Sequence, residues 1–439
     1  MMLAEFLLIV CATLSRHIPI ALAQLPSATN ADSCATEPWG RYSAAGGLYQ
    51  ADDDESSSKY LYSFGGDTRS TADSAGGGVV LTNFRFDLSN TGCWERLADG
   101  PVAIGYRATA ILLQNEFFFV FGGSDTSFQA VGHLYKYSIL DNTWEEIIVD
   151  GARPSARWRH TAVKLSDTTM LVHGGRRGNV VFSAAWIFDA EQMRWTLVSE
   201  DVGVAAHRHG MAYDSQRDIV WMYGGIDAGF VRHSRMYRWD WNSPNSTAVE
   251  VIGADGGESP SRRASHAFDF IPEMDSLITY GGACDDMGRT YLYNISSNQW
   301  CSMEAGQRPS LRDAMLWAID YPNFYMYQGD VICLKVGDVY GVADVHVLDL
   351  ESAFDWENTY NPRNQRATQH TVFCDGSNAG SCRVPPFLEE EPTSRWDAIC
   401  PRDDVPPTAA PLSTSEVLGS VPRFWVVAFL SVCYLCSIV

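Results

Sequence analysis

The chain has 439 residues, 46% of them hydrophobic, which is enough to build one large globular domain. Asp and Glu outnumber Lys and Arg by 53 to 32, so the formal net charge is −21 at pH 7. A charge of this sign argues against nucleic acid and anionic membrane surfaces as general partners.

The N-terminal segment 1–23 is predicted to be a secretory signal peptide. A short apolar stretch is followed by Ala21 and Ala23, which fit the small-x-small rule for cleavage. Glu5 stands where a positive charge is usual, and the alternative is a buried N-terminal helix. Residues 24–40 then form a lead-in to the folded domain.

From residue 41 to residue 360 the sequence consists of six units of about fifty residues. Each unit contains an apolar run that ends in Gly-Gly, except that the last unit has Gln-Gly. A strand that turns sharply at a crowded channel rim needs backbone angles or clearance that a Cβ would obstruct. A repeat of this length with β-rich units is typical of a propeller. The motifs are Gly65-Gly66, Gly122-Gly123, Gly174-Gly175, Gly224-Gly225, Gly281-Gly282 and, in degraded form, Gln328-Gly329.

About twenty residues after each motif, two large and mostly aromatic residues stand two positions apart. Residues at this spacing share one face of a strand, so each pair can pack against the neighbouring unit. A Trp follows in every unit except the fourth. The pairs are Phe84 and Phe86, Tyr135 and Tyr137, Trp186 and Phe188, Tyr237 and Trp239, Tyr291 and Tyr293, and His346 and Leu348; the tryptophans are Trp94, Trp144, Trp195, Trp300 and Trp356.

With these motifs in phase, the region 41–360 resembles the kelch-repeat family. The resemblance implies an all-β fold, a six-bladed kelch-type β-propeller with four antiparallel strands per blade; a seventh blade is the alternative. Gln328 predicts a differently shaped loop in the last unit, and the missing Trp leaves the packing of the fourth unit's outer strand open. The first unit is expected to start with a strand at 42–49, and the second unit to contain strands at 109–113, 117–121, 134–139 and 143–148.

The cysteines agree with export. Eight of the eleven lie outside the signal peptide and the C-terminal tail, an even number that is typical of disulfide bonding. We expect one bond between Cys284 and Cys301 inside the fifth unit and another between Cys374 and Cys382. No C-x2-C pair suggests a zinc site in the mature chain. Glycosylation sequons begin at Asn245 and Asn294, which also suits a secreted protein.

After the repeats the composition changes. Residues 361–400 are predicted to form a cysteine-containing appendage and residues 401–415 a Pro/Ser/Thr stalk. The segment 416–439 ends in an uncharged stretch that is shorter than the about 20 residues of a membrane-spanning helix, and no Lys or Arg follows it. A glycosylphosphatidylinositol signal with attachment at Ser413 is therefore expected, with a short membrane-spanning tail as the alternative.

Arginines recur at the residue that should open the innermost strand of each unit. Inner strands begin on the face where the Gly-Gly loops emerge, so these guanidinium groups would surround one mouth of the central channel. Guanidinium groups bind carboxylate, sulfate and phosphate bidentately. The alternative is a structural role, with the Asp residues that follow the glycines, such as Asp125 and Asp227, neutralising the ring. The six positions are Arg41, Arg107, Arg159, Arg208, Ser265 and Arg312, and Arg157, Arg176, Arg177, Arg262 and Arg263 lie nearby in the sequence.

These features lead to three functional hypotheses. No G-x-S-x-G or H-E-x-x-H motif is present, and we expect no catalytic residue, cofactor or metal. The first hypothesis is a non-catalytic, surface-tethered ectodomain that binds a protein or a glycan. The second is an extracellular enzyme acting on acidic sugars, since kelch-like N-acetylneuraminate epimerases exist. A third is a scaffold that only spaces other components. The sequence does not indicate an oligomeric state.

Overall fold

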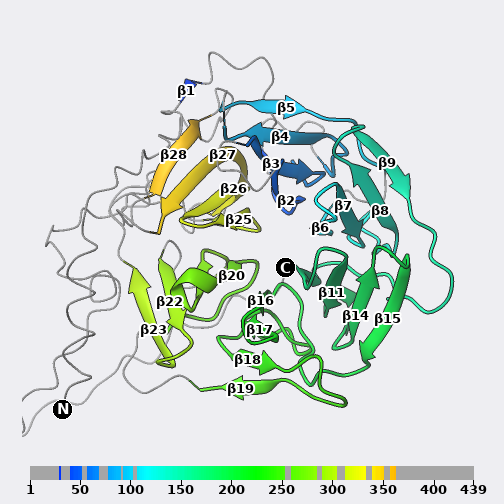
Figure 1. Ribbon diagram of the computed structural model, residues 1–439, viewed down its shortest axis with the longest axis vertical. Coiled ribbons are helices and arrows are strands. Elements are labelled where there is room, and N and C mark those ends of the chain that lie inside the picture. Colours follow the sequence, from blue (N-terminus) through cyan, green and yellow to red (C-terminus); the bar gives the residue numbers. More distant parts are fainter. Residues whose placement is uncertain are drawn as a thin grey trace, which may run out of the picture. The chain divides into compact units, whose positions relative to one another are not determined.

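The computed structural model describes residues 29–30, 40–51, 57–68, 78–89, 92–101, 106–252, 259–283, 289–303, 312–332, 339–350 and 356–361. All of them belong to the first of two compact units, Met1–Cys400; the second, Pro401–Val439, lies outside the described residues. Six antiparallel sheets follow one another around a ring (Figure 1). The six-bladed propeller expected from the repeats is therefore confirmed.

Each blade has four strands that come from one stretch of chain and pair in the order in which they occur, and blade 6 gains a further strand from the N-terminal side of the chain. Blade 1 contains β2 (Ala45–Gln50), β3 (Lys59–Phe64), β4 (Asn83–Asp87) and β5 (Trp94–Arg96). Blade 2 contains β6 (Thr109–Leu113), β7 (Phe117–Phe121), β8 (Leu134–Ser138) and β9 (Thr143–Glu146). Blade 3 contains β10 (Thr161–Lys164), β11 (Thr169–His173), β14 (Ala185–Asp189) and β15 (Arg194–Ser199). A hairpin of β12 (Arg176–Arg177) and β13 (Val180–Val181) interrupts blade 3.

The second half of the ring follows the same order. Blade 4 contains β16 (Gly210–Asp214), β17 (Ile219–Tyr223), β18 (Met236–Trp239) and β19 (Val249–Val251). Blade 5 contains β20 (Ala267–Ile271), β21 (Ser276–Tyr280), β22 (Thr290–Asn294) and β23 (Gln299–Met303), with a short 3-10 helix at Pro272–Met274. Blade 6 contains β25 (Leu316–Asp320), β26 (Asn323–Ile332), β27 (Val339–Asp349) and β28 (Trp356–Asn361), and β24 (Arg312–Asp313) also pairs with β26.

The strands of blade 2 lie almost where the sequence predicts them. The strands β6 and β7 occupy the expected ranges, whereas β8 and β9 end one and two residues early. The first inner strand begins at Ala45 rather than at Tyr42. A strand that the sequence did not predict, β1 (Thr29–Asn30), pairs in parallel with β28, so the lead-in adds an outer strand to blade 6.

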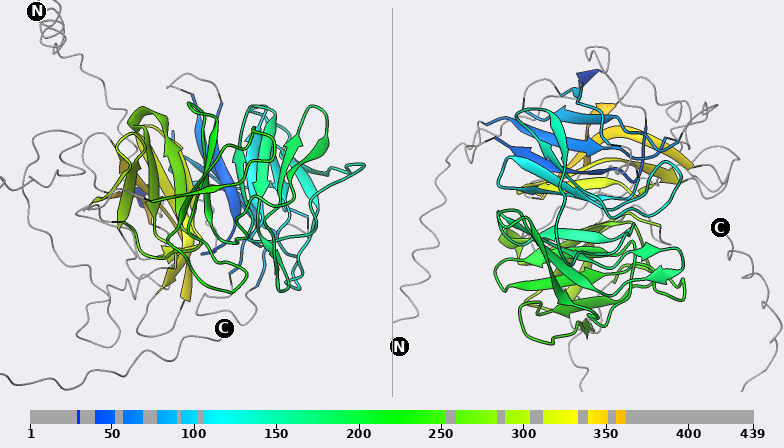
Figure 2. Two further views of the ribbon diagram at one scale, coloured as in Figure 1. Left: turned by 90° about the horizontal axis from the view of Figure 1, so that it is seen from below. Right: turned by 90° about the vertical axis from the view of Figure 1, so that its right-hand side faces the viewer.

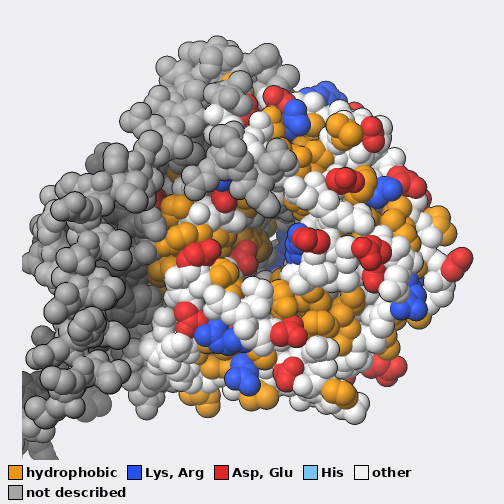
Figure 3. Space-filling model, in the orientation of Figure 1, with side chains coloured by type: hydrophobic (Ala, Val, Ile, Leu, Met, Phe, Trp, Pro, Cys, Tyr) orange, Lys and Arg blue, Asp and Glu red, His pale blue; other side chains and the backbone are white. Residues whose placement is uncertain are grey.

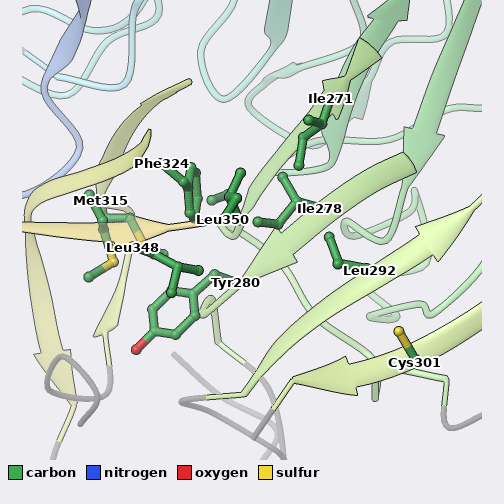
Figure 4. Close-up of a cluster of buried hydrophobic side chains, with 11 residues drawn as sticks. Ile271, Ile278, Tyr280, Leu292, Cys301, Met315, Phe324, Leu348 and Leu350 are labelled. Carbon is green, nitrogen blue, oxygen red and sulfur yellow. The ribbon is translucent and has the colours of Figure 1, made fainter. Parts of the chain in front are cut away.

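The hydrophobic core of the described residues is divided into six clusters, one at each interface between neighbouring blades. Between blades 5 and 6, for example, Ile278 and Leu292 pack with Phe324 and Leu348 (Figure 4). The side views in Figure 2 show the sheets of neighbouring blades standing face to face. The large residue pairs of the first five blades lie in or against these clusters, which confirms their predicted packing.

The two glycines of a motif contact different blades. A Cβ on Gly122 would lie 2.8 Å from Cε1 of His160 in the next blade, and one on Gly123 would lie 2.9 Å from Cβ of Ala108 in its own blade. Both glycines also have positive φ, at +64° and +92°. In the last unit Gln328 adopts φ 57° in place of the first glycine, and β26 continues past it, so a differently shaped connection is confirmed.

Blade 4 does form its outer strand without the missing Trp. This strand, β19, has three residues, and its Val249 is 66% exposed. Trp239 of the adjacent strand is buried, and its Nε1–H donates to the hydroxyl of Ser246 at 3.1 Å. The outer edge of this blade is therefore short and open to solvent.

Several sequence predictions concern residues outside the described ranges. These are the signal peptide 1–23, the stalk 401–415, the segment 416–439 and, except for Asn361, the appendage 361–400. Among the residues that the structure describes, no helix is both long enough and apolar enough to cross a membrane.

Candidate ligand-binding mouth

Six backbone hydrogen bonds close a ring at the end of the channel where the inner strands begin. The amide of each ring residue donates to the carbonyl of the equivalent residue in the preceding blade, over 2.8 to 3.2 Å. Each ring residue has a positive φ, between 50° and 59°, although none of them is glycine. The ring residues are Ser43, Arg107, Arg159, Arg208, Ser265 and Ala314.

The ring residues line a central channel with a volume of about 570 Å³. The hollow in the centre of Figure 3 is this channel, seen along its axis. Most of the rest of its wall comes from the inner strands of the blades, and Phe118 of β7 adds to it, so the wall includes residues of every blade.

In two of the six units the ring residue is not the arginine that the sequence predicts. Arg41 and Arg312 lie two residues before the ring, and Ser43 and Ala314 take the ring positions. The Arg41 side chain is buried and donates to the carbonyls of Gly65 and Thr82 at 2.9 and 2.7 Å. The Arg312 side chain lies outside the described residues.

Arg157 and Arg263 occupy the same structural position as Arg41. Their guanidinium groups donate to the carbonyls of Gly174 and Gly281. Each of these glycines is the first residue after a strand, β11 or β21. These arginines fasten the Gly-Gly turn of their own blade, as the structural alternative predicted. They are therefore not part of the mouth.

The remaining ring arginines stand side by side. Arg107, Arg159 and Arg208 belong to the adjacent blades 2, 3 and 4, and we call them the arginine triad. Burial, together with the neighbouring charges of Arg107 and Arg208, lowers the pKa of Arg159 to about 8. The triad is thus a concentration of like charge in a poorly solvated place.

Two of the carboxylates expected to neutralise the ring, Asp125 and Asp227, have partners in their own loops. Asp125 accepts hydrogen bonds from the amides of Ser127 and Gln129. Asp227 accepts one from the amide of Val231, and its Oδ2 lies 2.8 Å from Nε2 of His233. Each of these two carboxylates shapes its own loop, and neither forms an ion pair with Arg107 or Arg159.

Two of the three triad arginines pack against an aromatic residue that directly precedes them in the sequence. The guanidinium carbon of Arg107 lies 4.6 Å from the ring centre of Tyr106, and that of Arg159 lies 4.6 Å from Trp158. These two aromatic rings are 6.0 Å apart. The Nε atoms of Arg107 and Arg159 and the Nε1 atom of Trp158 are buried without a hydrogen-bond partner among the described residues. Buried donors of this kind are costly unless a ligand or water accepts from them.

Arg176 and Arg177 lie on the hairpin of blade 3. Arg176 donates to the carbonyl of Gly178, and its guanidinium carbon lies 5.2 Å from the ring centre of Phe230, which is 55% exposed. Burial and the charge of Arg107 lower the pKa of Arg176, so it belongs to the electrostatic surroundings of the triad. Arg177 is exposed.

A layer of buried histidines lies next to the ring. His160, His209 and His266 each follow a ring residue directly. A ring nitrogen of His160 lies 2.8 Å from the hydroxyl of Thr109, and His209 lies 3.0 Å from His173. Burial holds the pKa of each of these side chains far below its usual range, so they are neutral at pH 7.

The other predicted sites are only partly described. Asn245 is exposed, whereas Asn294 is half-buried and accepts a hydrogen bond from the amide of Ser297. Cys301 is disulfide-bonded, but its predicted partner Cys284 lies outside the described residues, so this pairing stays a prediction. The remaining sites, Cys374, Cys382 and Ser413, also lie outside the described residues.

Sequence reasoning missed Tyr106 and Trp158. A signal for them was present, because both stand directly before an arginine at equivalent points of their units. The register could not be recognised without the backbone ring, which fixes which arginine of a unit faces the channel.

Three kinds of similarity to known proteins agree with this fold. The family model described as KLHDC2/KLHL20/DRC7 Kelch-repeats domain matches residues 55–268. A solved structure titled "Structure of YjhT" aligns with a TM-score of 0.53 at 15% identity, over 71% of this chain and 96% of that one. At this identity the likeness concerns the fold alone.

Two curated relatives share parts of the sequence. The mouse Multiple epidermal growth factor-like domains protein 8 is 24% identical over 236 residues, which are 50% of this chain but only 8% of that protein. The N-acetylneuraminate epimerase of Salmonella enteritidis PT4 is 36% identical over 87 residues, 19% of this chain and 22% of the enzyme. Both matches thus cover a minor part of the relative. The repeats, the six blades and these similarities together lead to one conclusion: the chain belongs to the kelch-repeat β-propeller family.

Proposed function

We propose that this protein is a non-catalytic binding module outside the cell and that the arginine triad holds an acidic ligand, a protein segment or a glycan. The observation that carries the proposal is the state of Arg107 and Arg159. Each has a buried Nε without a hydrogen-bond partner among the described residues, and neither forms an ion pair there. A carboxylate, sulfate or phosphate would accept from these donors and offset the repulsion within the triad.

The chemistry of the surroundings supports an anion with an apolar part. Tyr106 and Trp158 lie beside the triad, and the exposed Phe230 lies against Arg176. Aromatic faces bind the apolar faces of sugars and of peptide side chains, while the guanidinium groups bind the charge. An acidic sugar or an acidic peptide with hydrophobic residues has both features.

The proposal includes a place at the cell surface. It rests on the signal peptide over 1–23 and on a lipid anchor at Ser413, both argued from the sequence. Phosphatidylinositol-specific phospholipase C should release the protein from cells. Retention on cells after this treatment, together with detection of the 424–439 peptide by intact mass, would favour the membrane-spanning tail instead.

A second candidate function is catalysis on an acidic sugar. The identity of 36% with N-acetylneuraminate epimerase over 87 residues favours it. It is tested by adding the purified protein to freshly dissolved N-acetylneuraminate and following the two anomers by proton NMR. Equilibration faster than in buffer, and loss of this acceleration in an Arg159→Gln variant, would establish the enzyme; an unchanged rate would leave the binding module.

The binding function is tested by calorimetry at low salt. The probes are glucuronate, N-acetylneuraminate and a hexaglutamate peptide, with glucose as the neutral probe. Arg159→Gln should weaken binding of an acidic probe at least about tenfold, because charge-assisted contacts are worth roughly 1.5 to 3 kcal/mol each. Arg194→Gln, on the exposed start of the outer strand β15, removes the same charge far from the channel and should change nothing. Equal affinities in both variants would contradict the proposal.

A further inference from the structure

One channel position differs between blades in a way that packing does not explain. Four residues after the ring residue, five blades carry small or apolar side chains: Gly47, Ile111, Val163, Ala212 and Ala318. Blade 5 carries Asp269 at this point of β20. A carboxyl group at a position that the fold otherwise fills with apolar groups needs a specific reason to be there.

Asp269 belongs to the channel wall. Of the described residues that line the channel it is the only carboxylic acid. Its side chain is half-buried, accepts hydrogen bonds from the indole N–H of Trp317 and, at 2.9 Å, from the amide of Phe270, and forms no ion pair among the described residues. Trp317 lies on the inner strand of blade 6 and also lines the channel. Both donors favour a fixed orientation of the carboxylate.

The channel therefore carries groups of opposite charge at two depths. The arginine triad stands at the ring, and Asp269 stands four residues further along an inner strand, a distance of roughly 13 Å at the usual rise per residue. Between these depths the wall includes Ala110, Met211 and Leu316. An apolar wall with a cationic end and an anionic group matches an extended molecule with an anion at one end and a hydrogen-bond donor at the other.

We propose that Asp269 is a second ligand contact, which accepts from an ammonium group of a ligand whose anionic end is held by the arginine triad. The inference rests on the proposed function and extends it, because it assigns the ligand two opposite charges and a length. The ligand class is an ω-amino acid or another zwitterion of similar span.

The carboxylate is available for this role near neutral pH. Burial raises the pKa of Asp269 to about 6, while its hydrogen bonds oppose the shift. At pH 7.5 the group is ionised and attracts a cation. Lys164, the lysine of the channel wall, forms an ion pair with Asp167, so it does not neutralise Asp269.

The inference is tested with two matched probes, octanoate and 8-aminooctanoate, by calorimetry at pH 7.5 and low salt. Wild-type protein should bind 8-aminooctanoate about tenfold more tightly than octanoate, as one charged hydrogen bond predicts. In Asp269→Asn, which keeps an acceptor for Trp317 and a similar shape, this ratio should fall to about one. The affinity for octanoate should be the same in both proteins.

Two further results separate the inference from the proposed function. If octanoate binds in an Arg159-dependent manner but the amine brings no advantage in wild type, the role of Asp269 is wrong and the arginine triad stands. If octanoate binding is unchanged in Arg159→Gln, the proposed function fails, and the two-ended ligand fails with it.

If Asp269→Asn does not fold, ω-amino acids of different chain length are compared on wild-type protein instead. The advantage of the amine over its unsubstituted acid should be largest for a chain that spans the two depths and absent for 4-aminobutanoate. An advantage that is equal at all lengths would show that the ammonium does not reach a fixed partner, and would overturn the inference.

Discussion

The amide of Ser43 donates to the carbonyl of Ala314 over 3.0 Å and so joins the first blade to the last. The other five bonds of the ring each connect consecutive blades, but this one closes the circle between two ends of the repeat region. The bond requires left-handed backbone at both residues, with φ of 54° and 50°. Closure of the propeller thus depends on an unfavourable conformation that six hydrogen bonds hold in place.

This strain predicts opposite effects for two Ala→Gly changes in blade 6. At Ala314, glycine should relieve a left-handed conformation that costs roughly 1 kcal/mol for alanine, so stability should be unchanged or higher. At Ala318, a buried strand position in β25, the same change should lower the free energy of unfolding by about 1 kcal/mol or more. Urea unfolding of both variants measures the difference, and equal losses would contradict the account of the ring.

The Gly-Gly motif predicts a second matched pair. Gly122→Ala places a Cβ 2.6 Å from the carbonyl oxygen of Arg157 at positive φ, and should cost about 3 kcal/mol through overpacking and backbone strain. Gly78→Ala should be neutral within about 0.5 kcal/mol, because nothing lies within 4 Å of its Cβ. Denaturant midpoints of the two proteins provide the measurement. A neutral Gly122→Ala would show that the turn can rearrange.

The sequence predicts the blades well because their signals are local. The period of the Gly-Gly motif and the spacing of pairs such as Tyr135 and Tyr137 depend only on strand geometry and on contact with the next blade. The register of the mouth is different: a unit such as blade 3 has both Arg157 and Arg159, and residue type alone does not tell which one faces the channel. Backbone hydrogen bonds between blades decide this, and they place Arg41 outside the ring.

Asp269 could not be recognised from its own surroundings in the sequence. It stands in a strand among Phe268 and Phe270, where an alternating polar residue is ordinary. Only the superposition of six inner strands on a common ring residue shows that its equivalents are small or apolar, as at Gly47 and Val163.

We expect Arg159 to favour ligand binding but to lower the stability of the ligand-free protein. Because burial and like charge disfavour its ionised form, Arg159→Gln should raise the melting temperature of the ligand-free protein while it weakens acidic ligands. Arg157→Gln should lower it, because the carbonyl of Gly174 loses a buried donor. Thermal unfolding of both variants decides whether the two arginines, two residues apart, differ as the structure indicates. A lower melting temperature for Arg159→Gln would assign it a structural role.

The predicted disulfide in blade 5 should be found by peptide mapping without reduction. Cys301, on the outer strand β23, is disulfide-bonded, and Cys284 is the expected partner. Closing a loop of this size is worth roughly 3 kcal/mol in the chain-entropy model. A peptide in which Cys301 is joined to another cysteine, or a free thiol at either position, would show the pairing to be wrong.

The buried histidines predict that acid unfolds the propeller. Burial lowers the pKa of His160 to about 3 and that of His173 to about 4, against about 6.5 in the unfolded chain. Between these values the unfolded state binds the proton and the folded state does not. Each of these histidines therefore lowers the free energy of unfolding by about 1.4 kcal/mol for every pH unit below 6.5, until its folded pKa is reached.

Asp269 has the opposite effect on the free energy of unfolding as the pH falls, so its replacement gives a second test. Its pKa is raised to about 6, so the folded state binds its proton first, and this group alone adds stability as the pH falls through that value. Free energies of unfolding measured in urea from pH 7 to pH 4 should therefore fall more steeply in Asp269→Asn than in wild type. In His160→Gln the fall should be shallower by about 1.4 kcal/mol per pH unit. A profile that is flat over this range, or the same in all three proteins, would mean that the histidines can reach solvent and charge without unfolding the ring.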